Sequence, residues 1–99
     1  MRTGCVLMIA VPAVAAAAGS LAAERPVTLK DAPARAVVEN NCGACHSLDY
    51  IPMNSPFPTA KVWQAEVTKM IRVFGAPISP ADAEAITGYL TENYGSPEK

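Results

Sequence analysis

Apolar and polar positions follow a helical period in the stretch from Thr59 to about Phe74. Apolar residues recur there at spacings of four, three and four, while the charged residues lie largely on the opposite side. Such a stripe is typical of the buried face of an amphipathic helix. The pattern therefore predicts a core-facing helix with Thr59 as its N-cap and a stop at Gly75. The apolar stripe consists of Trp63, Val67, Met70 and Phe74, with Ile71 adjoining them.

A second periodic stretch begins at Ser79. Pro80 follows this serine directly, and Asp82 lies three positions after it. A serine N-cap, a proline at the first position and an acid in the first turn all favour a helix N-terminus. The stretch predicts a C-terminal helix that ends at Gly95, in which Gly88 costs stability and is expected to allow close packing against a neighbour. Its apolar positions are Ala83, Ile86, Tyr89, Leu90 and Tyr94.

The part of the chain before Thr59 has weaker periodicity. A short helix is predicted from about Ala32, with Asp31 as its N-cap and Pro33 in the first turn. Residues Ser47–Pro58 are predicted to form a loop, because three prolines interrupt them. No stretch has the alternation of a strand. The sequence therefore predicts an all-α domain with three main helices.

The beginning of the chain has the three-part pattern of a secretory signal peptide. Arg2 gives it a positive start, an apolar run extends over Val6–Ala18, and small residues surround Ala22. The apolar run is too short for a comfortable membrane span, although a retained N-terminal anchor is the alternative. Cleavage after Ala22, with Ala18 and Ala23 as the alternatives, predicts a leader over 1–22. The mature domain over 23–99 would then lie in the periplasm without membrane association.

Charge and composition argue against several classes of function. The whole chain carries a net charge of −1, and loss of Arg2 with the leader leaves 7 basic residues against 9 acidic ones. No basic patch is interleaved with aromatic residues, so nucleic acid is not an expected partner. A nearly neutral protein also lacks a strong field to steer many partners. No Ser-His-Asp set or paired carboxylates stand out, because Asp82 and Glu84 have the positions of ordinary first-turn acids.

The residues Cys42-Gly43-Ala44-Cys45-His46 have the form C-x-x-C-H, which is the attachment signature of a c-type haem. Two thiols at this spacing can form thioether bonds to the two vinyl groups of one porphyrin, and the histidine can donate a ring nitrogen to the iron. A mature chain of about 77 residues has a marginal core, which a covalently held porphyrin would stabilise. The motif predicts one haem c bound through Cys42 and Cys45, with His46 as an axial ligand.

Other interpretations of the motif leave some of its residues without a role. A structural zinc site needs four ligands, but the one further cysteine, Cys5, lies in the leader, and His46 is the only histidine. A thioredoxin-like cysteine pair belongs to a βαβ context, which the sequence does not predict. A plain disulfide would give His46 no task. Covalent haem attachment outside the cytoplasm also agrees with the predicted export.

The second axial position of the iron must fall to a residue other than histidine. Two of the four methionines leave with the leader, so the candidates are Met53, Met70, a weaker ligand such as lysine, or no residue. Met70 has ample chain to reach the opposite face of a porphyrin, and it shares the apolar stripe with Trp63. Met53 lies seven residues after His46, where prolines and polar residues indicate turns. We therefore expect Met70 to be the ligand, with Met53 as the alternative.

Methionine ligation has a consequence for function. A thioether raises the reduction potential of the iron, and it fills the position where oxygen or a substrate would bind. Both effects suit an electron carrier and count against a catalytic haem. The second ring nitrogen of His46 normally needs a hydrogen bond to fix its orientation, and we expect a carbonyl of the Ser47–Pro58 loop to accept it.

Several stretches together resemble one known family. CGACHSLDYI, WQAEVTKM, FGAPI and the final YLTENYG are similar to the small monohaem cytochrome subunits of bacterial sulfite dehydrogenases (sulfite:cytochrome c oxidoreductases). The resemblance extends from about Val37 to Gly95. It implies a class I cytochrome c fold around a covalently bound haem and a location in the periplasm. Within that fold Cys42 and Cys45 would be the thioether sites, and His46 and Met70 the axial ligands.

The resemblance also implies the partners. A molybdopterin-containing subunit would oxidise sulfite in a heterodimer with this chain, which would be its electron-transfer subunit and not the enzyme. A soluble cytochrome c would then accept the electrons. The alternatives are a freestanding soluble monohaem carrier serving another periplasmic dehydrogenase, and a small haem enzyme or gas sensor with an open iron site. Tyr50 and Trp63 could approach the haem or its propionates, or could simply pack in the core.

Overall fold

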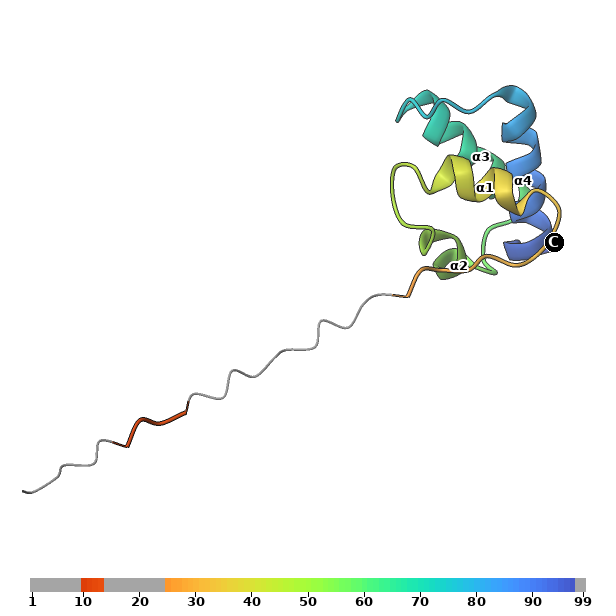
Figure 1. Ribbon diagram of the computed structural model, residues 1–99. Helices are drawn as coiled ribbons and strands as arrows, with labels where there is room; N and C mark the ends of the chain where they lie inside the picture. The colour runs from red at the N-terminus through yellow and green to blue at the C-terminus, as the bar shows by residue number, and fades with distance from the viewer. Residues whose placement is uncertain (1–9, 14–24, 98–99) are drawn as a thin grey trace, which may run out of the picture.

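Four helices and no strand occur in residues 10–13 and 25–97, which are the residues that the computed structural model describes. The prediction of an all-α chain is confirmed for this part. The expected leader over 1–22 lies outside the described residues except for 10–13, which are irregular and exposed. None of the described helices combines the length and apolar character that a membrane span requires. The helices are α1 (Arg35–Cys42), α2 (Tyr50–Asn54), α3 (Ala60–Arg72) and α4 (Pro80–Tyr94), as Figure 1 shows.

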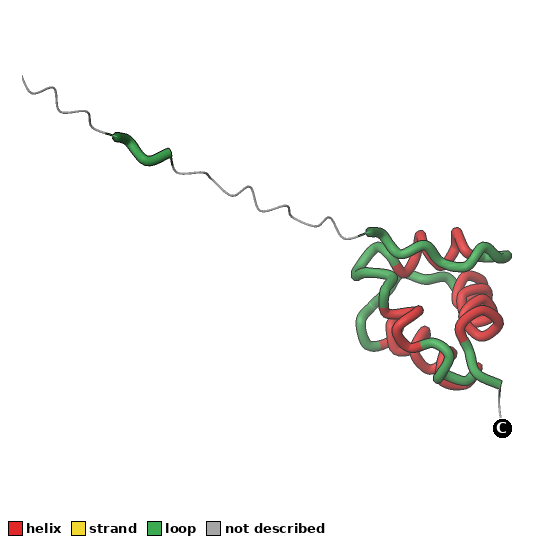
Figure 2. Tube along the Cα trace, turned by 90° about the horizontal axis from the view of Figure 1, so that it is seen from below, coloured by secondary structure: helices red, strands yellow, loops and turns green. Residues whose placement is uncertain are grey.

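Helix α4 is the element against which the others pack. The backbones of α1, α2 and α3 each come close to α4, whereas no two of these three helices have closely approaching backbones. The loops over 43–49 and 55–59 connect α1, α2 and α3, and Figure 2 shows the helices separated by such loop segments. Four of the nine buried apolar residues belong to α4, and each of the other helices contributes one or two. The core is therefore centred on α4; its members are Leu29, Val38, Ile51, Trp63, Val67, Ile86, Tyr89, Leu90 and Tyr94.

The two long helices begin at the predicted caps. The hydroxyl of Thr59 accepts a hydrogen bond from the backbone N–H of Val62 at 3.4 Å, and the hydroxyl of Ser79 accepts one from Asp82 at 3.1 Å. These hydroxyls satisfy backbone donors that have no partner within the first helical turn. Pro80 occupies the first turn of α4, where a missing N–H costs nothing. Both predicted N-caps are confirmed.

The predicted cap of the first helix is wrong. Helix α1 begins at Arg35 and follows Ala34, whose φ of 71° lies in the left-handed region. The carbonyl of Ala32 accepts the N–H of Arg35 at 3.2 Å, so the backbone itself closes the turn before the helix. Asp31 does not cap α1. Its carboxylate lies 3.6 Å from the guanidinium of Arg35 instead.

Two further expectations about the chain between the long helices need correction. Helix α2 occupies part of the predicted Ser47–Pro58 loop. Pro52 is tolerated there because the N–H groups in the first turn of a helix have no partner within it. Helix α3 ends at Arg72, and Phe74 is 69% exposed and not part of the buried stripe. Gly75 has a φ of 70°, and the chain turns away from the helical path at this point.

Gly88 does not have the role that the sequence suggested. A Cβ atom at this position would meet nothing within 4 Å, so close packing of a neighbour does not explain the glycine. Gly88 instead lines an outer groove between α3 and α4. The prediction failed because helix propensity shows the cost of a glycine but not which face of the helix it occupies.

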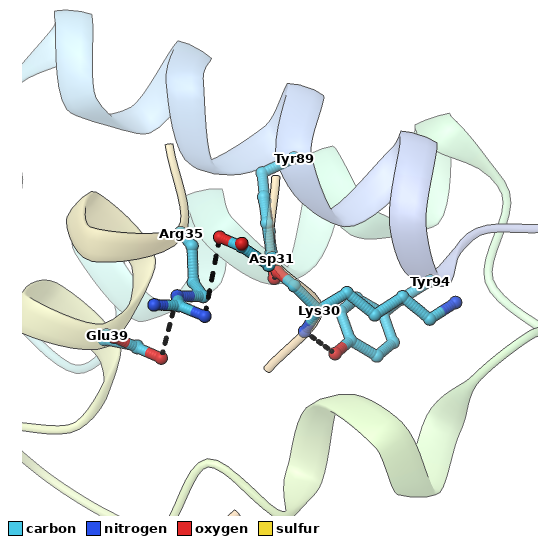
Figure 3. Close-up of polar contacts among 6 residues, drawn as sticks. All are labelled: Lys30, Asp31, Arg35, Glu39, Tyr89 and Tyr94. Atoms are coloured by element: carbon cyan, nitrogen blue, oxygen red, sulfur yellow. Dashed lines mark hydrogen bonds and ion pairs between the residues drawn. The ribbon is translucent and has the colours of Figure 1, made fainter. Parts of the chain in front are cut away.

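Two tyrosines of α4 are hydrogen-bonded to the segment before α1. The backbone N–H of Lys30 donates to the hydroxyl of Tyr94 at 2.9 Å, and the hydroxyl of Tyr89 donates to the carbonyl of Lys30 at 2.6 Å. Figure 3 shows these residues beside Arg35, which lies between Asp31 and Glu39. Burial, together with the neighbouring Tyr94, raises the pKa of Tyr89 to about 12. We call this arrangement the tyrosine clasp; it consists of Lys30, Tyr89 and Tyr94.

Candidate haem attachment site

The C-x-x-C-H motif lies at the C-terminal end of α1. Cys42 is the last residue of the helix, Gly43 is its C-cap, and Cys45 and His46 belong to the turn that follows. A Cβ atom at Gly43 would lie 2.8 Å from the carbonyl oxygen of Glu39, too close without a shift of the backbone. Glycine therefore avoids a steric contact at the C-terminus of α1, where the motif turns away from the helix.

No disulfide joins the two cysteines of the motif. Cys42 is half-buried and Cys45 is exposed. Burial raises the pKa of the Cys42 thiol, which keeps it protonated at neutral pH. The surroundings of the two sulfur atoms therefore differ, with Cys42 the more enclosed of the pair.

His46 is exposed and its ring is held from one side. Its Nδ1 lies 2.9 Å from the carbonyl oxygen of Ser47. A carbonyl can only accept, so this hydrogen bond requires the proton on Nδ1, and the lone pair of the neutral ring is then on Nε2. The ring also lies beside Tyr50, with 5.9 Å between the centroids. The expectation that the Ser47–Pro58 loop supplies the carbonyl is confirmed, and Ser47 is the residue that supplies it.

Hydrogen bonds between Ser47 and Asp49 stabilise the turn that contains this carbonyl. The hydroxyl of Ser47 donates to the carboxylate of Asp49 at 2.7 Å and accepts the backbone N–H of Asp49 at 3.3 Å. Helix α2 follows directly, and Ile51 is buried on it. Because α2 packs on α4, the position of the Ser47 carbonyl is linked to the core of the domain.

The two candidate thioethers have different surroundings. Met70 is half-buried on α3, on the side that carries the buried residues Trp63 and Val67. Met53 is on α2 and is 73% exposed. A half-buried thioether beside apolar neighbours can exclude water from a bound metal, which an exposed one does less well. The ligation by Met70 stays a prediction, with Met53 as its alternative.

Trp63 has a feature that the sequence could not show. Its indole Nε1 is buried and has no hydrogen-bond partner among the described residues. An unsatisfied buried donor costs about 1–3 kcal/mol, and such donors are rare. An acceptor oxygen from a bound group would remove this cost. A haem propionate offers such an oxygen, so the residues present fit a porphyrin held by the motif.

Other sites for a cofactor are not prominent. No group of three or more His, Cys, Asp or Glu side chains within 10–13 and 25–97 could hold a metal ion. Two hollows of about 420 and 590 Å³ lie on the outer side of α3 and between α3 and α4, and neither includes a residue of the motif. The motif at the end of α1 is therefore the candidate site with the most specific chemistry.

Comparison with known protein families finds no matching family model, and comparison with curated proteins finds no significant match. The function of the chain is therefore inferred from its own residues.

Proposed function

We propose that this chain is a c-type monohaem cytochrome, the electron-transfer subunit of a periplasmic sulfite dehydrogenase. Catalysis would take place on a molybdopterin-containing partner, and a soluble cytochrome c would accept the electrons. The observation that carries the proposal is the motif at the end of α1, where two cysteines precede an exposed imidazole whose Nδ1 lies 2.9 Å from the carbonyl oxygen of Ser47. The resemblance over Val37–Gly95 supports the choice of partner and of a class I cytochrome c fold.

The residues of this chain have separate tasks in the proposal. When bound, a haem c supplies a carrier for single electrons. Cys42 and Cys45 hold it covalently, and His46 presents Nε2 because the Ser47 carbonyl holds Nδ1–H. Met70 supplies the thioether on the other side. Trp63 donates its unpaired Nε1–H to a carboxylate oxygen.

Ligation from both sides suits electron transfer rather than catalysis. His46 and Met70 would both be ligands of the bound group, so oxygen or a substrate would find no open position at its metal. The apolar side of α3, with Trp63 and Val67 buried on it, keeps water away from the thioether. Methionine also stabilises the ferrous state, which raises the reduction potential.

Covalent attachment can be tested directly. The protein purified from a host that attaches haem c should keep its haem after denaturation and treatment with acid acetone, and a pyridine haemochrome spectrum should show the c type. Cys42→Ala and Cys45→Ala together should abolish the attachment. Extractable haem in the parent protein, or none, would contradict the proposal.

The assignment of the partner needs a separate experiment. Sulfite added to the complex purified from the native source should reduce the haem rapidly in a stopped-flow spectrum, while the isolated chain should barely react. A haem that stays oxidised while sulfite is consumed would exclude this route. Failure to isolate a stable complex would favour the freestanding soluble carrier.

A further inference from the structure

The charges of the two long helices are segregated, although the whole chain has a net charge of only −1. Helix α3 carries Lys61, Lys69 and Arg72 against Glu66, a net charge of +2. Helix α4, which packs beside it, carries only acids, which are Asp82, Glu84 and Glu92. The expectation that a nearly neutral chain lacks a useful field is therefore incomplete, because its opposite charges lie on different helices.

The three cations of α3 share one outer surface. Positions 61, 69 and 72 fall on one side of a helix and cover about 16 Å along its axis. All three side chains are exposed, and they line one shallow hollow of about 420 Å³. We call this surface the basic face of α3 and define it by Lys61, Gln64, Thr68, Lys69, Arg72 and Val73.

Helix stability does not explain Lys61, the first of the three cations on this face. Lys61 lies in the first turn of α3, where the helix dipole disfavours a positive charge. Neither Lys61 nor Arg72 has an ion pair among residues 10–13 and 25–97. The ammonium Nζ of Lys69, in contrast, lies 2.6 Å from the carboxylate Oε2 of Glu66. Lys69 and Arg72 are also three residues apart, a spacing at which like charges repel. Lys69 and Arg72 lie in the last turn of α3, where the helix dipole favours a positive charge, so Lys61 is the cation whose placement helix stability does not explain.

Exposed apolar side chains adjoin the same face. Val73 lines the hollow and is 70% exposed, and the next residue, Phe74, is 69% exposed. An apolar centre with charged groups beside it is the usual composition of a protein-protein interface. Aromatic residues at such a centre contribute more to binding than most of their neighbours.

We propose that the basic face of α3 docks a partner protein through an acidic surface. Carboxylates of the partner lie against Lys61 and Arg72, while Val73 and Phe74 contact its apolar centre. The docking itself does not depend on the proposed haem. The opposite side of α3 carries Met70, so the partner would lie about 10 Å, one helix diameter, from Met70.

The test uses poly-L-glutamate as an acidic polypeptide probe and the mature protein with any covalent group that it carries. Titration of the ¹⁵N-labelled protein at low salt should shift the amide signals of Lys61, Gln64, Thr68, Lys69 and Arg72. Lys61→Gln should weaken binding about threefold and Lys61→Gln with Arg72→Gln about tenfold, because single exposed ion pairs contribute little. Added salt should weaken binding by the parent protein more than binding by the double variant.

Arg25→Gln is the matched control, because Arg25 is exposed and lies before α1. It removes the same charge from the chain and should leave the binding constant unchanged. Equal weakening by Arg25→Gln and Lys61→Gln would overturn the proposal, as would signal shifts that avoid α3 or a complete lack of binding. Tighter binding to phosphatidylglycerol vesicles than to poly-L-glutamate would assign the face to lipid instead. Salt-sensitive self-association that Lys61→Gln abolishes would assign it to a second copy of the chain.

Discussion

The α4 side of the molecule and the motif side differ in how many of their apolar side chains are buried and how many of their polar groups are hydrogen-bonded within the chain. On the α4 side, Ile86 and Val38 have no exposed surface, and the tyrosine clasp pairs both the N–H and the carbonyl of Lys30. On the motif side, which we define as residues 42–57, Ile51 is buried but three other large apolar side chains are uncovered. Tyr50, Met53 and Phe57 are 67%, 73% and 81% exposed, and the His46 ring is exposed with them.

This difference indicates where the chain completes its own packing and where it does not. A domain of this size buries only a small apolar core. Several exposed aromatic and aliphatic side chains in one short stretch therefore indicate that a bound group or a partner covers them. The unpaired Nε1 of Trp63 points to the same conclusion, because the donor lacks an acceptor that this chain provides among its described residues. A covalently held porphyrin would supply both the apolar surface and the acceptor.

The largest expected effect comes from the motif side. Replacing Cys42 and Cys45 together by alanine should leave little folded protein, because the porphyrin would be lost from a chain whose own core is small. Circular dichroism and hydrogen exchange can measure the folded fraction, with exchange rising most in residues 42–57. A double variant as stable as the parent would show that the motif side does not depend on an attached group.

A large effect is also expected at the centre of the α4 side. Ile86→Ala should lower the free energy of unfolding by about 2–5 kcal/mol, because the side chain is fully buried and its removal leaves a cavity. Chemical denaturation of the protein gives this value. Val62→Ala is the matched control, since Val62 is 45% exposed on α3 and should change stability little. Similar losses in both variants would mean that α4 is not the centre of the core.

The two methionines allow a direct comparison of a half-buried and an exposed thioether. Met70→Ala should abolish the weak far-red sulfur-to-iron band of the ferric protein and lower its reduction potential, because a thioether favours ferrous iron. Met53→Ala should leave the band in place. Absorption spectroscopy and a redox titration check both outcomes. The opposite result would assign the ligand to Met53.

The smallest effect is expected at the tyrosine clasp, and it depends on pH. The pKa of Tyr89 is raised to about 12, above its ordinary value of 10.0, so the folded state favours the protonated phenol. This contribution is fully present below about pH 10 and is lost as the pH rises toward 12. Tyr89→Phe should cost about 1 kcal/mol at neutral pH and flatten the loss of stability between pH 10 and 12.

Urea denaturation at a series of pH values measures both effects of Tyr89→Phe. Tyr50→Phe is the control, because its ring is exposed and it should change neither the stability nor its dependence on pH. A parent protein that keeps its full stability up to pH 12 would show that the Tyr89 hydroxyl is not held in the clasp.

Local chemistry in the sequence was sufficient for the long helices and for the candidate motif. Thr59 and Ser79 cap α3 and α4 as expected, because capping needs only a side-chain oxygen and the next few backbone N–H groups. The buried positions Trp63 and Val67 also follow from the helical period. The spacing of Cys42, Cys45 and His46 is likewise visible in the sequence, although the groups around them are not.

Tertiary structure decided the rest, because the partners lie far apart along the chain. Helix α2 has only five residues, a length that is not stable alone in water, and it forms because Ile51 is buried against α4. The clasp joins Lys30 to Tyr89 and Tyr94 across 59 and 64 positions, which no local pattern reveals. The unpaired Nε1 of Trp63 depends on every neighbour that surrounds the ring. Such features depend on which surfaces contact each other in the folded chain. A hydrophobic period shows which face of an element is buried, but not which other element covers it.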